Sequence, residues 1–201
     1  KMQKKKFSYF LTNSSGHSYI KSANHKLAWI AFLQNKQKEK SNYFSNVMTA
    51  SASFIDADKV ALNDAKRNYI THPVLLKSRL LYDGGYYSLA LKQISQLGGD
   101  HYFESLSHRT EYWYRLARIY SKLKIGDKAI IEHYKKVLSL SKNNTDYYIP
   151  MSALQIGLIY EQDNNLNKAN YYFNKCLSIS GFDYERSIHQ KARRGLLRVR
   201  R

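Results

Sequence analysis

The sequence is poor in the residues that define several common classes of protein. Its 201 residues include one cysteine, Cys176, so no disulfide can form within the chain. That count fits a reducing, cytoplasmic compartment without excluding the periplasm. No run reaches the roughly 18 apolar residues of a membrane-spanning helix, so no membrane span is expected in this segment. Only two prolines occur and 43% of the residues are hydrophobic, which favours a folded, helical protein.

The sequence also lacks the common signatures of catalytic and cofactor sites. It has no glycine-rich phosphate loop and no Gly-x-Ser-x-Gly nucleophile elbow. The histidines His101 and His108 flank a glutamate, but their spacing matches no established zinc site. Asp56 and Asp58 lack the glycine and the later glutamate of a calcium loop, so one of them is predicted to cap the helix that follows. We therefore predict no catalytic residue, no metal and no cofactor, and a protein that is not an enzyme.

The strongest compositional signal is charge. The formal net charge is +18, from 33 basic and 15 acidic residues. One interpretation is an acidic partner, such as nucleic acid or an acidic protein surface. The other is a lysine-rich composition spread over solvated helix faces. The lysines are scattered rather than gathered in one block, which favours the second interpretation and leaves the first open.

Two segments share one apolar pattern. The first part of each has apolar or small residues at i, i+3, i+4 and i+7, which form one stripe of a helix. These residues are Trp113, Leu116, Ala117 and Tyr120 in one copy, and Ala153, Ile156, Gly157 and Tyr160 in the other. A second stripe follows in each: Ala129, Tyr134, Val137 and Leu138, or Ala169, Phe173, Cys176 and Leu177. The pattern predicts two helical hairpins in register.

Small residues within these stripes indicate close helix packing. Ala117 and Ala129 are expected to let the two helices of the first hairpin approach, and Gly157 and Ala169 those of the second. A glycine inside a helix costs about 1 kcal/mol relative to alanine, so Gly157 indicates a packing requirement. Cys176 falls at a buried position, which predicts a packed and inert thiol rather than a nucleophile.

The spacing extends the pattern towards the N-terminus. Ala90 is expected to correspond to Ala129 and Ala169, at intervals of 39 and 40 residues. We predict about ten to twelve helices and no sheet. His101 to Leu106 is expected to form a short bridging helix, and Asp183 to cap the last helix. The predicted regions are a degenerate helical region at 1–70, three repeats at about 73–97, 110–141 and 150–180, and a basic capping helix at 181–201.

This pattern resembles the tetratricopeptide repeat, a pair of antiparallel helices of about 34 residues. The resemblance is carried by the stripes within 111–179 and extends to 75–97. It implies an all-α, right-handed α-solenoid of antiparallel helix pairs, here with a period of about 40 residues and a C-terminal capping helix. The phrases at 26–29, 56–59 and 81–86 also resemble the C-terminal part of a bacterial family of longer repeat proteins, which implies a bacterial source and a longer parent chain.

The resemblance also implies a function. Repeats of this kind are not themselves enzymes, and their first helices line a concave groove that binds peptides or partner proteins. The family's groove positions fall on Leu75, Arg79, Tyr82, Tyr114, Arg118, Ser121, Lys122, Leu154, Leu158 and Glu161. The lysine–asparagine clamp that some members use to hold a C-terminal carboxylate is not matched by these residues, so binding of chaperone tails is not predicted.

Three functional hypotheses follow. The first is a scaffold that binds a protein or peptide, with an acidic partner expected from Arg79 and Arg118 at equivalent groove positions. The second is a helical array that binds nucleic acid through its basic surface. The third is an accessory domain attached to an enzyme elsewhere in a longer chain.

Overall fold

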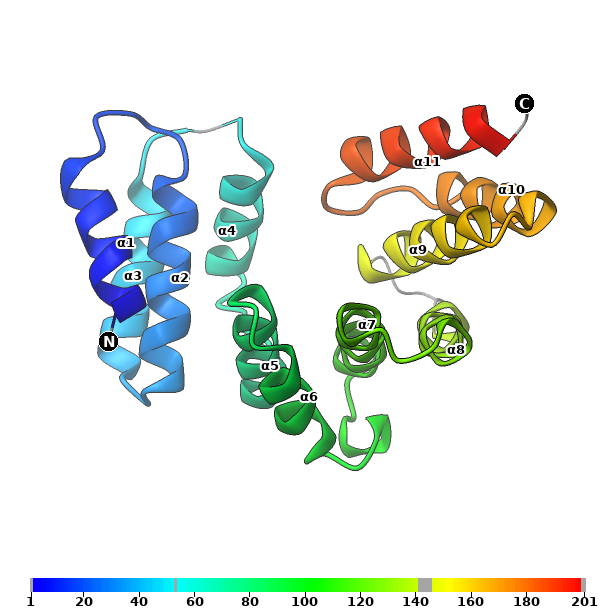
Figure 1. The fold of residues 1–201 in the computed structure, drawn as a ribbon. Helices are drawn as coiled ribbons and strands as arrows, with labels where there is room; N and C mark the ends of the chain where they lie inside the picture. The colour runs from blue at the N-terminus through cyan, green and yellow to red at the C-terminus, as the bar shows by residue number, and fades with distance from the viewer. Residues whose placement is uncertain (1, 53, 141–145, 200–201) are drawn as a thin grey trace. The chain divides into compact units, whose positions relative to one another are not determined.

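The computed structural model describes residues 2–52, 54–140 and 146–199. Over these residues the fold consists of eleven α-helices and one 3₁₀ turn, without a strand (Figure 1). The prediction of an all-α fold with about ten to twelve helices is confirmed. The chain divides into two compact units, residues 1–71 and 72–201, and each is described by itself.

The first unit contains four helices that pack around α2. Their bounds are α1 (Met2–Asn13), α2 (Ile20–Leu33), α3 (Gln37–Thr49) and α4 (Asp56–Lys66). Helix α2 contacts each of the other three. The core between α2, α3 and α4 contains Ala28, Phe44, Val47, Ala61 and Ala65.

The start of α2 is capped by a residue from another helix. The Asp58 carboxylate is fully buried and accepts hydrogen bonds from the backbone nitrogens of Tyr19, at 2.8 Å, and Ser22, at 2.7 Å. The prediction that Asp56 or Asp58 caps its own helix is wrong, because Ile55 occupies the N-cap position of α4. Asp58 instead satisfies amides that the first turn of α2 cannot pair internally.

A buried lysine joins the same turn of α2 to the end of α3. The ammonium of Lys21 donates hydrogen bonds of 2.7 Å to the carbonyl oxygens of Val47 and Ala50, although the residue is only 4% exposed. The last carbonyl groups of a helix have no hydrogen-bond partner within it, and a cation at this C-terminal end interacts favourably with the helix dipole. The first turn of α2 is therefore fixed to both α3 and α4.

The second unit consists of three antiparallel helix pairs and one further helix. The pairs are α5 (Pro73–Asp83) with α6 (Tyr87–Ser95), α7 (Leu106–Leu123) with α8 (Asp127–Ser139), and α9 (Tyr148–Gln162) with α10 (Leu166–Leu177), followed by α11 (Glu185–Val199). Each first helix packs against the next first helix, and α6, α8 and α10 pack against α7, α9 and α11 respectively. Helix α11 therefore takes the place of the first helix of another pair.

Two predicted helix boundaries differ from the structure. The segment predicted as a bridging helix contains only a 3₁₀ turn at Asp100–Tyr102, and α7 already begins at Leu106. The last helix begins at Glu185, two residues after Asp183, and Tyr184 before it has a positive φ. The residues at both places are largely polar, so the apolar periodicity of the sequence does not indicate where the helix begins.

The buried small residues reveal a shift of one residue in the middle pair. In each pair, the first helix buries a small residue and the second helix buries a residue opposite it. These residues are Ser78 and Ala90, Ala117 and Ile130, and Gly157 and Ala169. The separation is 12 residues in the outer pairs and 13 in the middle pair. Ala129, predicted to fill this position, is only half-buried. Gly85, Lys124 and Asn164 each have a positive φ seven residues after the small residue, so the extra residue of the middle pair lies between Lys124 and Ile130, where Gly126 also has a positive φ of 53°.

Candidate partner-binding surface

The ten predicted groove residues lie on the first helices α5, α7 and α9, but they differ in exposure. Leu75 and Leu154 are 0% exposed and Tyr114 is 4% exposed, so all three belong to the core between successive pairs. Arg79, Tyr82, Arg118, Leu158 and Glu161 are half-buried, and Ser121 and Lys122 are exposed. A partner could therefore contact only the last seven of these residues.

Arg118 forms the centre of this surface. The carbon Cζ of its guanidinium lies 4.1 Å from the centroid of the Tyr82 ring and 5.6 Å from that of Tyr114. The space between Tyr82, Arg118, Ser78 and Ile119 is too small to admit a water molecule. A cation placed over an aromatic ring gains about 0.5–2 kcal/mol, more where the site is dry. Arg118 is therefore held in one orientation by residues of α5 and of its own helix.

A buried ion pair supports Arg118 from within the same helix. Arg115 and Glu111 are 3% and 1% exposed, and Arg115 Nε donates a hydrogen bond of 2.6 Å to Glu111 Oε1. Burial alone lowers the pKa of Arg115, but the Glu111 carboxylate outweighs it and raises the pKa above its ordinary value. The pair was not predicted, although a glutamate four residues before an arginine on a helix was visible in the sequence. Such a pair fixes geometry more than it adds stability.

The two arginines predicted at equivalent positions have different surroundings. Arg79 Nε lies 3.7 Å from Asp83 Oδ2, one turn further along α5. Arg118 makes no ion pair with a carboxylate in the part of the chain that the structure describes. Although burial lowers the pKa of Arg118, the hydroxyls of Tyr114 and Tyr82 raise it overall. Among the predicted groove residues, Arg118 is therefore a cation that contacts aromatic rings rather than a carboxylate.

The C-terminal part of the predicted groove is closed by α11. Glu161 accepts hydrogen bonds from Arg198, at 2.5 Å to Nε and 2.8 Å to Nη2. Because both oxygens of Glu161 are occupied, its role in the structure is to hold α11 against α9. The contact was not predicted, since the two residues are 37 positions apart.

Aromatic residues at the start of α9 pack behind Tyr114. The ring of Tyr148 lies 4.9 Å from that of Tyr114, and the ring of Tyr147 lies 6.0 Å from it. Tyr147 in turn meets Tyr184 at 5.7 Å. Burial raises the pKa of the Tyr114 hydroxyl well above its ordinary value, so this tyrosine stays neutral. These contacts join α7, α9 and the start of α11 into one rigid support.

Comparison with known protein families agrees with this geometry. The tetratricopeptide-repeat family model matches residues 110–144 and 152–183, which cover most of the α7–α8 and α9–α10 pairs. These matches, over about one third of the chain, support a protein with tetratricopeptide repeats. Neither the curated proteins nor the solved structures contain a match to this chain. Tetratricopeptide repeats generally mediate protein–protein interactions, and the family is typically a non-catalytic scaffold.

Searches for two other kinds of site gave negative results over the described residues. No group of three or more histidine, cysteine, aspartate or glutamate side chains is placed to hold a metal ion there. In the same residues, no helix is both long enough and apolar enough to cross a bilayer. The surface on the first helices is therefore the site on which a functional proposal can be built.

Proposed function

We propose that residues 72–201 form a non-catalytic scaffold that binds an acidic peptide segment of a partner protein along the first helices. The observation that carries the proposal is the guanidinium of Arg118, stacked over Tyr82 without a carboxylate partner in the described chain. A guanidinium that is stacked on one face keeps its N–H edge for a planar, bidentate contact with a carboxylate. Because the stack already fixes its rotamer, little side-chain entropy is lost when a ligand binds.

The neighbours of Arg118 define the rest of the peptide. Ser121 and Lys122, about one turn further along α7, are exposed and offer a hydroxyl donor and a second cation. Leu158 on α9 is half-buried and offers an apolar contact. We therefore expect an acidic residue opposite Arg118, a second acidic residue near Lys122, and an apolar or aromatic residue near Leu158.

The test is a peptide array of acidic sequences, followed by titration of the best peptide against the purified chain. Arg118→Gln should weaken binding about ten- to a hundred-fold, because a charge-assisted hydrogen bond contributes roughly 1.5–3 kcal/mol. Tyr82→Leu should also weaken binding, since it removes the stack that orients the guanidinium. Arg186→Gln on α11 removes the same charge from an exposed position outside this surface and is the matched control.

A pulldown from cell extract addresses natural partners. Partners of the wild-type chain should be lost from Arg79→Ala/Arg118→Ala, and should survive nuclease treatment. If the double variant retains every protein partner, or if Arg186→Gln weakens peptide binding as much as Arg118→Gln, this assignment is wrong.

A further inference from the structure

The outward side of α10 and α11 is basic. Helix α10 contains no acidic residue, and α11 contains only Glu185. Glu185 is turned away, because its Oε2 accepts a hydrogen bond of 2.7 Å from the backbone nitrogen of Gly181. Apart from Arg198, which pairs with Glu161, the exposed cations of α11 make no ion pair within the described residues; they are Arg186, Lys191, Arg193 and Arg194.

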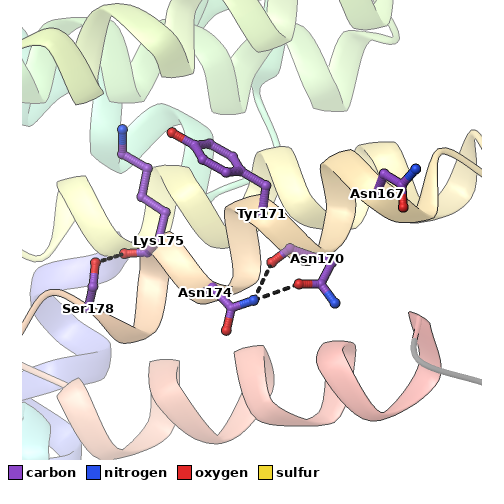
Figure 2. A pocket seen from close by; sticks show the side chains of 6 residues that line it. All are labelled: Asn167, Asn170, Tyr171, Asn174, Lys175 and Ser178. Carbon is purple, nitrogen blue, oxygen red and sulfur yellow. Dashed lines mark hydrogen bonds between the residues drawn. The ribbon is translucent and has the colours of Figure 1, made fainter.

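An open depression of about 660 Å³ lies along α10, the helix against which α11 packs. Its lining combines an aromatic ring, side-chain amides and one cation: Tyr171, Asn167, Asn170, Asn174, Lys175 and Ser178. Tyr171 is 60% exposed, so its ring is open to solvent. In Figure 2, Asn170 and Asn174 lie on the side of α10 nearer α11, and Tyr171 and Lys175 project from the opposite side.

The amides of the depression are ordered but retain binding capacity. Asn174 Nδ2 donates to the side-chain oxygen of Asn170 at 2.6 Å and to its carbonyl oxygen at 2.9 Å. The Asn170 amide nitrogen and the Asn174 side-chain oxygen take no part in these bonds and lie on the α11 side of α10 in Figure 2. Such a combination matches the mixed donor and acceptor edges of nucleobases.

The arginines belong to α11, the helix that packs next to α10. Arg198 is held toward α9 by Glu161. Arg186 and Arg193 are seven residues apart, about two helical turns, and lie on the opposite flank of α11 from Arg198. Helix α11 packs on both α9 and α10, and Figure 2 shows it along the asparagine side of α10, with Tyr171 and Lys175 on the other side. A ligand that reached both the α11 arginines and Tyr171 would therefore cross the asparagines of α10.

We propose that this surface, defined by Asn170, Tyr171, Asn174, Lys175, Arg186 and Arg193, binds single-stranded nucleic acid. Bases would stack on Tyr171 and bond to the asparagines, while Arg186, Arg193 and Lys175 contact phosphates. Proteins that bind single strands combine these two elements, a basic track and exposed aromatic rings. The stacking ring selects single strands, since a duplex keeps its bases stacked on one another.

An anionic membrane fits this surface less well. The apolar stripe of α11 is already buried against the repeats through Ile188, Ala192 and Leu196. Its outer face carries a single exposed apolar side chain, Leu197. A helix that inserts into a membrane interface needs a broad free apolar face as well as cations.

The test is fluorescence anisotropy of the full chain with a labelled 20-nucleotide oligouridine over a range of salt concentrations. Tyr171→Ala should weaken binding about ten-fold or more, as for loss of one stacked base. Arg186→Gln/Arg193→Gln/Arg194→Gln should weaken binding and lower the slope of log K against log salt by about 1.4, near 0.7 for each of the two phosphate contacts assigned to Arg186 and Arg193. Lys5→Gln/Lys6→Gln/Lys38→Gln removes the same charge from exposed positions of the first unit and is the control. Circular dichroism checks that each variant is folded.

Several results would overturn the proposal. One is that the oligonucleotide fails to bind at 50 mM salt, another is that the control triple variant loses as much affinity as the α11 variant, and a third is that Tyr171→Ala binds with unchanged affinity. Equal affinity for a duplex of the same length would show that Tyr171 does not select single strands. Binding to phosphatidylserine vesicles with loss in the α11 variant, but none to oligouridine, would identify a membrane surface instead. Arg118→Gln should leave oligonucleotide binding unchanged, so this proposal and the peptide proposal can fail separately.

Discussion

The ring of Phe173 on α10 lies directly against the backbone of Gly157 on α9. A Cβ atom at position 157 would come within 2.6 Å of Cε1 of this ring. On its other side the ring meets Gly195 of α11, where a Cβ atom would come within 2.5 Å of Cζ. Phe173 is fully buried and cannot move outward. Two glycines on different helices therefore make the space that one aromatic ring fills.

We expect Gly157→Ala to destabilise the second unit by about 1–3 kcal/mol, because the added methyl group overpacks the core against Phe173. The gain of about 1 kcal/mol in helix propensity opposes this loss, so the net effect should lie at the lower end. Urea unfolding measures it. Gly157→Ala/Phe173→Leu removes the ring atoms in question and should be less destabilised than the sum of its single variants. Simple additivity would contradict the packing role.

Asp58→Ala should destabilise the first unit by about 1–3 kcal/mol, because two amides in the first turn of α2 lose their acceptor. The matched control is Asp56→Ala, in which a half-exposed carboxylate 3.6 Å from Lys59 is removed; it should cost less than about 1 kcal/mol. Hydrogen exchange at Tyr19 and Ser22 provides a local readout. Equal losses in the two variants would contradict the capping role of Asp58.

Cys176 should react slowly with a thiol reagent in the native protein. It is 0% exposed, and burial raises its pKa to about 12, so very little thiolate exists at pH 8. The reaction with a coloured disulfide reagent should become fast in denaturant, where the thiol is exposed and its pKa returns to its ordinary range. Fast labelling under native conditions would show that α10 opens readily.

The second unit should lose stability as the pH falls below about 6.5. Burial lowers the pKa of His133, whose ring lies between Trp113 and Tyr120. The pKa of His72 is lowered mainly by burial and, to a smaller extent, by the charge of His108. The unfolded state therefore takes up protons at a higher pH than the folded state, and unfolding is favoured as the pH falls. Urea unfolding at pH 7.5 and 5.0 measures this. His133→Phe keeps the aromatic contacts and should reduce the difference between the two pH values.

Periodicity was sufficient to predict the helical pairs. Side chains such as Trp113 and Tyr120 recur at helical spacing because one face of α7 is buried. The apolar periodicity of the sequence therefore indicates which face of the helix is buried. The pattern could not choose between Ala129 and Ile130 for the contact opposite Ala117. Both positions are compatible with a helical stripe, and the choice depends on the turn between Lys124 and α8, where Gly126 has a positive φ. A one-residue change in a turn leaves almost no trace in the sequence.

The functional surface was less predictable than the fold. The sequence placed Tyr82 and Arg118 on one wall, but not in contact with each other. Side-chain pairing across two helices depends on rotamers, which a repeat pattern does not encode. The same holds for Asp58, whose partner Tyr19 is 39 residues away. The basic face of α11 was visible as a charge pattern, whereas the depression beside Tyr171 depends on the packing of α10.

The order of helix contacts has a consequence for how the chain folds. Within each unit, the helix pairs with extensive contact in the described residues are neighbours in the sequence or are separated by one helix. Such local contacts require little loop closure, and proteins built from them fold quickly for their size. In stacked repeats folding can begin in any pair and spread to the next. Amide exchange should accordingly report local opening, fastest at the outer helices and slowest where α7 is covered on both sides.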